Sequence, residues 1–193
     1  MANSEFGKDH GLLHEVVVTG RKVGAGEEFW AGLAHNEGLF ARVVAFVAEA
    51  MRMIFHRKAT IERNMEGWTC LEPATAEECE FEASVHEFLL PKEASIGGEE
   101  MVKRAKESGI SSGLRDAEAM LRQQDKIPSD LRKCVLVFPE VWQSPRGVRN
   151  VWYLAWDGDE WYLVYGWLRN DFCSYDRLVG SRKYQKDLGH LET

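Results

Sequence analysis

Residues 150–168 read NVWYLAWDGDEWYLVYGWL, a stretch in which two alternating apolar runs flank a turn signal. An Asp-Gly step between such runs is a strong indicator of a tight β-hairpin. The turn has two possible centres, Asp157-Gly158 or Gly158-Asp159, and the two registers differ by two residues in pairing, so they give the hairpin the same faces. The stretch therefore predicts a β-hairpin that belongs to a larger sheet.

Both faces of this hairpin are apolar. One face carries Trp152, Leu154, Trp156, Trp161, Leu163, Tyr165 and Trp167, and the other carries Val151, Tyr153, Ala155, Tyr162, Val164 and Leu168. Burying one large ring is worth roughly 2 to 3 kcal/mol, so exposing a whole face would forfeit much of a domain's net stability of about 5 to 15 kcal/mol. Most rings are therefore expected in the core. The remainder, Trp156, Trp161, Trp167 and Tyr165, is predicted to line a binding surface.

The rest of the chain alternates helical and strand patterns. A β-branched run at Glu15–Thr19 predicts a strand, and apolar residues at helical spacing follow from Glu27, interrupted near Asn36, which can cap a new helix. Acidic residues after Gly97-Gly98 and an apolar face over Leu114–Gln124 predict a helical hairpin. We expect an α+β fold: an N-terminal strand and helices, with the helical hairpin packed on a mostly antiparallel, aromatic-rich sheet.

The expected organisation has four segments along the chain. Residues 1–14 are predicted to be disordered, residues 15–60 form a strand-helix segment, residues 61–183 form the α+β region with hairpin 150–168, and residues 184–193 form a frayed tail. The two middle segments are expected to make one compact unit.

The chain carries a net charge of −7, and its acidity is concentrated. Residues 72–100 hold nine glutamates against the single cation Lys92. This field repels phosphate backbones and disfavours nucleic acid as a partner. The longest apolar run, Leu39–Phe55, contains Arg42, Glu49 and Arg52 and is too interrupted to predict a membrane span.

The four cysteines are widely spaced and form no CxxC pair, which argues against a zinc ribbon. The N-terminal residues do not resemble a secretory signal. We therefore expect reduced thiols in a cytoplasmic protein, without a cofactor.

Residues Cys79–Leu89 alternate in polarity, which predicts a strand with one solvated face. That face holds Glu80, Glu82 and His86, and two carboxylates with an imidazole are suitable ligands for a divalent ion. A metal-dependent hydrolase using these side chains is one hypothesis. A solvated acidic face is the plainer interpretation of the same residues.

Several short motifs of the C-terminal half occur in an order that resembles other proteins. They are GGEE at Gly97–Glu100, Ile127-Pro128, LVFP at Leu136–Pro139, YLAWDGDEW at Tyr153–Trp161, Trp167, and DRLVGSRK at Asp176–Lys183. Over roughly residues 97–183 the chain resembles a group of short uncharacterised bacterial proteins. The motifs are aromatic and turn residues, so the resemblance implies a bacterial cytoplasmic origin and no mechanism.

The sequence favours a non-catalytic protein-binding or adaptor module that engages another protein or a second copy of itself. No catalytic constellation is visible in the sequence, and Cys173 has no base that the sequence places beside it. Two alternatives remain at this point: the metal-dependent hydrolase, and a small-molecule or sugar binder that uses tryptophan as a stacking platform.

Overall fold

The computed structural model describes residues 16–50, 52–74 and 77–185. The chain divides into two compact units, Met1–Met51 and Arg52–Thr193. The sequence indicates one unit with a segment boundary at residue 60, whereas this division falls at Met51. The predictions for residues 1–14 and for the tail beyond residue 185 lie outside the described residues.

The first unit is helical. Residues 16–22 form a helix, followed by α2 (Glu27–His35) and α3 (Glu37–Ala50). The predicted strand at Glu15–Thr19 is wrong for residues 16–19. A helix brings Gly20 against the ring of Trp30, where an added Cβ would lie 2.3 Å from the Trp30 Cζ2 atom, so a packing contact overrides the β preference of three valines. The predicted cap is confirmed: Asn36 Oδ1 accepts the Leu39 N–H at 2.9 Å.

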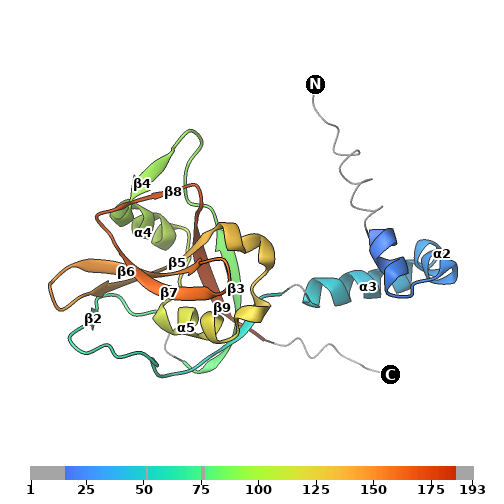
Figure 1. The fold of residues 1–193 in the computed structure, drawn as a ribbon, viewed down its shortest axis with the longest axis horizontal. Helices are drawn as coiled ribbons and strands as arrows, with labels where there is room; N and C mark the ends of the chain where they lie inside the picture. The colour runs from blue at the N-terminus through green and yellow to red at the C-terminus, as the bar shows by residue number, and fades with distance from the viewer. Residues whose placement is uncertain (1–15, 51, 75–76, 186–193) are drawn as a thin grey trace. The chain divides into compact units, whose positions relative to one another are not determined.

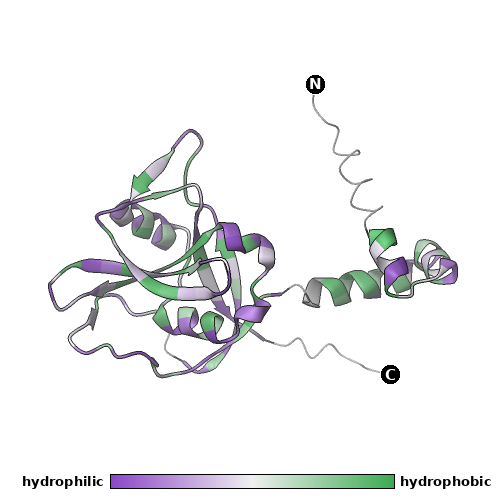
Figure 2. Cartoon of the chain, in the orientation of Figure 1, coloured by the Kyte–Doolittle hydropathy of each residue, from purple (hydrophilic) through white to green (hydrophobic). Residues whose placement is uncertain are grey.

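The helices of this unit keep their apolar side chains accessible, and Figure 2 colours much of α3 as hydrophobic. The exposed large apolar residues are Val16, Val18, Val23, Phe29, Phe40, Val44, Phe46 and Val47. Among the described residues, none of the helices combines the length and the apolar content that a bilayer crossing requires.

The second unit is built on a seven-stranded sheet with the strand order β1-β3-β9-β5-β6-β7, and β2 pairs with β5. The strands are β1 (Ile54–Arg57), β2 (Thr69–Cys70), β3 (Cys79–His86), β5 (Val135–Gln143), β6 (Arg149–Trp156), β7 (Trp161–Trp167) and β9 (Asp176–Lys183). Only the β5–β9 pairing among these strands is parallel. The α+β class and the mostly antiparallel sheet are thus confirmed (Figure 1).

Shorter elements complete the unit. They are a two-stranded sheet of β4 (Ser95–Gly97) and β8 (Asp171–Cys173), the helices α4 (Gly98–Glu107) and α5 (Leu114–Arg122), and the 3-10 segments η1 (Gln124–Lys126) and η2 (Ser129–Lys133). Consecutive strand residues point to opposite faces of a sheet. The β5 residue that a helix contacts therefore shows which face of the sheet that helix covers.

The two helices cover opposite faces of the sheet. Met101 and Ala105 of α4 pack in one cluster with Val137, and Met120 of α5 packs in another with Leu136. The predicted helical hairpin is therefore wrong in its packing, because α4 and α5 are separated by β5 and β6 (Figure 1). Both faces of the central strands are apolar because each one has its own helix to cover it.

The aromatic hairpin forms as predicted. Trp156 pairs with Trp161 and Trp152 with Tyr165, which gives the predicted faces and selects the register centred on Gly158-Asp159. Gly158 has φ +115°, a backbone conformation that L side chains rarely adopt. The Asp157 carboxylate accepts the N–H groups of Asp159 and Glu160, each at 3.0 Å, which closes the turn.

Candidate functional site

The strand β7 lies at one end of the sheet order, so one side of it pairs with β6 and the other has no strand partner among the described residues. The bonded pairs Asp157 N–Glu160 O (3.2 Å) and Leu168 N–Arg149 O (3.0 Å) fix the alternation of the ladder. Because bonded and non-bonded pairs alternate in an antiparallel hairpin, every second residue of β7 points its backbone groups away from β6. These residues are Trp161, Leu163, Tyr165 and Trp167, and we call their outward N–H and C=O groups the β7 edge.

Part of the β7 edge is already bonded within the chain. The Trp161 N–H donates to Gln124 Oε1 at 2.8 Å, and the Trp167 carbonyl accepts the Asn170 N–H at 3.0 Å. The outward N–H and C=O groups of Leu163 and Tyr165 have no hydrogen-bond partner within residues 16–50, 52–74 and 77–185. The middle of the β7 edge is therefore open to another strand.

Large aromatic side chains flank this open edge. Tyr162 is 45% exposed, Tyr165 43% and Trp167 42%. The guanidinium of Arg169 lies 4.2 Å from the centroid of the Trp167 ring, and the Trp68 ring meets Tyr165 edge-on at 5.0 Å. Aromatic rings held in place in this way offer contact area at a low cost in conformational entropy.

The four side chains predicted to bind a partner divide into two groups. Tyr165 and Trp167 lie exposed beside the β7 edge, whereas Trp161 is 2% exposed and belongs to the core. Trp156 packs edge-on against Trp161 at 5.8 Å and lies beneath the guanidinium of Arg132 at 4.1 Å. The prediction for Trp161 as a surface residue is wrong, because α5 and η1 cover that end of the hairpin.

The residues predicted to bind a metal lie on the solvated face of β3. The Glu82 carboxylate is held by the guanidinium groups of Arg52, at 3.1 Å, and Arg182, at 2.7 Å, while His86 Nε2 lies 2.7 Å from the Ser84 hydroxyl. Across the part of the chain that the structure describes, no three His, Cys, Asp or Glu side chains come together as a metal site. Glu80, Glu82 and His86 thus share a face without forming a ligand set.

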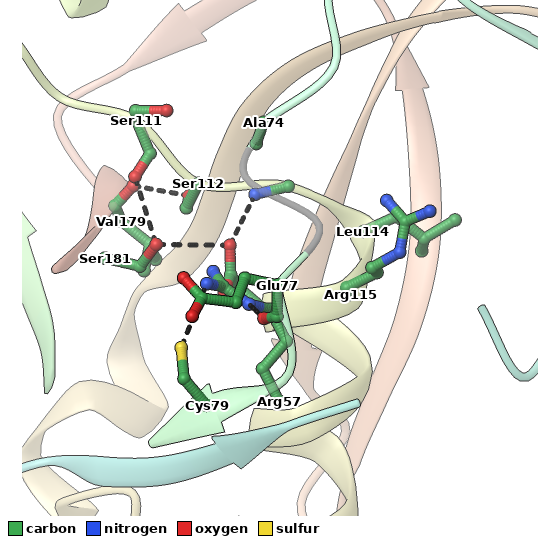
Figure 3. Close-up of polar contacts among 12 residues, drawn as sticks. Arg57, Ala74, Glu77, Cys79, Ser111, Ser112, Leu114, Arg115, Val179 and Ser181 are labelled. Carbon is green, nitrogen blue, oxygen red and sulfur yellow. Dashed lines mark hydrogen bonds and ion pairs between the residues drawn. The ribbon is translucent and has the colours of Figure 1, made fainter. Parts of the chain in front are cut away.

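A buried ion pair joins α5 to β1. Arg57 Nη1 donates to Asp116 Oδ1 at 2.7 Å, and its other nitrogens donate to the Glu77 carbonyl at 2.9 Å and to Cys79 Sγ at 3.2 Å (Figure 3). Burial acts to lower the pKa of the Arg57 guanidinium, but the charges and hydrogen bonds of Asp116 and Cys79 together outweigh it and hold that pKa above its usual value. Burial raises the pKa of the Asp116 carboxyl above its usual value, although Arg57 and the hydrogen bonds from Gly113 and Ser181 act in the opposite direction. The Ser181 hydroxyl donates to this carboxyl at 3.2 Å.

A second buried carboxylate, Glu140, holds the start of α5. It accepts the N–H groups of Ala74 at 2.8 Å and Leu114 at 2.9 Å, and the Trp142 indole N–H at 2.7 Å. A Cβ added at Gly113 would come within 2.6 Å of this carboxyl group. An anion at a helix N-terminus is stabilised by the unpaired N–H groups and by the helix dipole, so Glu140 acts as a structural cap.

A cavity of about 290 Å³ opens beside this cap and is lined by both Glu140 and Ser112. Lys106 and Glu72 form an ion pair at its rim. Burial, followed by the charge of Glu140, raises the pKa of the neighbouring Cys70 thiol to about 11. The thiol is therefore protonated at neutral pH, and the carboxylate is engaged by three N–H donors, which gives both groups a structural role rather than that of a nucleophile and its base.

Sequence reasoning placed Leu163 on a face of the hairpin but did not single it out as a site residue, and it missed Arg57 and Asp116. An available signal was the spacing of Phe55 and Arg57 along β1. Residues two apart in a strand share a face, so Arg57 lies on the same buried face as Phe55. No comparable signal exists for the β7 edge, because the order of strands in the sheet is not written in the local pattern of any one of them.

Comparison with protein-family models, with curated proteins and with solved structures found no match for this chain. The resemblance to a group of bacterial proteins, and the bacterial and cytoplasmic origin that it implies, therefore stay predictions.

Proposed function

We propose that this protein is a non-catalytic protein-binding module that takes up an extended segment of another polypeptide along the β7 edge. The observation that carries this proposal is the pair of residues Leu163 and Tyr165, whose outward backbone groups have no partner among the described residues. An unpaired sheet edge is a template for strand addition, in which main-chain hydrogen bonds supply affinity and flanking side chains supply selectivity.

The side chains beside the edge support the same function. Tyr162 lies on one face of β7 and Tyr165 and Trp167 on the other, so an added strand would contact rings on both of its sides. Charged residues are absent from Trp161–Trp167, the whole of β7. Natural edge strands are commonly protected by an inward-pointing charge, a proline or a bulge, and β7 has none of these devices within its seven residues.

The test uses extended peptides selected from a random library on the purified full chain. Bound peptides are expected to slow the amide exchange of Leu163 and Tyr165, because those N–H groups become donors in a new ladder. Tyr165→Pro removes one outward N–H and should abolish peptide binding, while Tyr165→Val loses the same ring, keeps the N–H and should retain weaker binding. Peptides that bind equally well to both variants would refute strand addition at this edge.

A further inference from the structure

The charges around β7 are distributed unequally between its two ends. The hairpin tip that precedes the strand carries the exposed acids Asp159 and Glu160, and the residue Arg169 follows the strand and is also exposed. Within the described residues, none of these three side chains has an ion-pair partner. The guanidinium of Arg169 stacks on the Trp167 ring. One end of the strand is thus acidic and the other basic.

Such a strand is complementary to itself in the antiparallel sense. If two copies of β7 overlap fully, Val164 lies on the two-fold axis, Leu163 faces Tyr165 of the other copy, and Asp159 faces the Arg169 position. The two Leu163–Tyr165 pairs would each exchange two hydrogen bonds, since outward-facing residues form the bonded pairs of the new ladder. A parallel arrangement would instead bring like charges together at both ends.

We infer that the polypeptide received by the β7 edge is the β7 strand of a second copy of this chain, paired antiparallel about a two-fold axis at Val164. This inference rests on the proposed function, because it requires the β7 edge to accept a strand. It adds the identity of the partner: the same surface on both subunits, with the same residues contacting one another, as an isologous interface requires.

Charge exchange tests this partner directly by sedimentation equilibrium of the full chain over a range of concentrations. Arg169→Glu places acid against acid at both ends of the pair and should raise the dimer dissociation constant about tenfold or more. The double variant Asp159→Lys/Glu160→Lys places base against base and should weaken the dimer similarly. An equimolar mixture of the two variants restores both attractions and should form a heterodimer with an affinity near that of the unmodified chain.

Arg146→Glu is the matched control, since this exposed arginine lies in the loop between β5 and β6 and carries the same change of charge; its dimer should be unaffected. A chain that stays monomeric, or a dimer that is equally stable in every variant, would overturn the inference. In the second case the contact lies elsewhere, with the exposed apolar helices of residues 16–50 as the first surface to test.

Failure of the inference and failure of the proposed function give different results. If the chain is monomeric but selected peptides still protect the Leu163 and Tyr165 amides, the edge accepts strands from another protein and only self-pairing is refuted. If neither peptides nor a second copy protects these amides, both proposals fail.

Discussion

The two edges of the large sheet differ in how their backbone groups are treated. At the β1 edge, the outward carbonyl of Ile54 accepts the Lys126 ammonium group at 3.2 Å, and that of His56 accepts the Arg122 guanidinium at 2.9 Å. At the β7 edge, the Gln124 side chain reaches Trp161 and leaves the next two outward residues without a partner among the described residues.

The difference lies in what surrounds the strands. α5 and η1 run beside β1 and send long polar side chains to its carbonyls, and the buried Arg57–Asp116 pair fixes α5 to that strand. Covering an edge with a helix is one of the ways in which proteins prevent unwanted strand addition. The β1 edge is thus covered from within the chain, whereas the middle of the β7 edge keeps the unpaired backbone groups that the proposed strand addition requires.

The largest expected effect comes from the pair that seals the β1 edge. Arg57→Met leaves Asp116 buried with an uncompensated charge and should lower the free energy of unfolding by about 3 to 5 kcal/mol, measured by urea denaturation. Adding Asp116→Asn to this variant removes the stranded charge and should recover part of the loss. A loss below about 1 kcal/mol for Arg57→Met would show that the pair does not anchor α5 to β1.

A smaller effect separates the inner and outer sides of β7. Val164→Pro removes an N–H that bonds to β6 and leaves a carbonyl unpaired, which should cost about 1 to 3 kcal/mol more than Tyr165→Pro, whose lost N–H faces outward. Thermal and urea unfolding of the two variants measure this difference. Equal destabilisation by both prolines would mean that the assigned orientation of the strand is incorrect.

The smallest effect concerns the side chains over β1. Replacing Arg122 and Lys126 by methionine removes exposed hydrogen bonds and should cost less than about 1 kcal/mol each, but it uncovers the carbonyls of Ile54 and His56. We expect the double variant to associate more strongly with rising concentration, as seen in light scattering. Lys133→Met, a matched change at an exposed residue of η2, should leave association unchanged. If the double variant also left association unchanged, Arg122 and Lys126 would not be protecting the β1 edge.

The fold class, the aromatic hairpin and its faces were accessible from the sequence because strand alternation is a local pattern. The packing of α4 and α5 on opposite faces was not, since it depends on which faces β5 and β6 present to each helix. The strand predicted at Glu15–Thr19 failed because a contact with Trp30 determines that segment. Burial of Trp161 likewise depends on η1, which is distant in sequence.

Only the side chains of the exposed site could be predicted from the sequence, and its unpaired backbone groups could not, because they too depend on contacts between distant parts of the chain. Tyr165 and Trp167 followed from a surplus of aromatic residues, but the unpaired backbone beside them follows from the order β1-β3-β9-β5-β6-β7. That order brings β9, the last strand of the described residues, into the middle of the sheet and leaves β7 at its edge. No hydrophobic periodicity points to this long-range arrangement.

Residue-resolved amide hydrogen exchange, followed from dilute to concentrated protein, tests the open β7 edge most directly. We expect the inward amides of Tyr162 and Val164 to be protected at every concentration. The amides of Leu163 and Tyr165 should exchange rapidly in dilute protein and become protected as strands are added. Slow exchange of all four amides in dilute, monomeric protein would contradict an open edge, because it would show that the chain closes the β7 edge by itself.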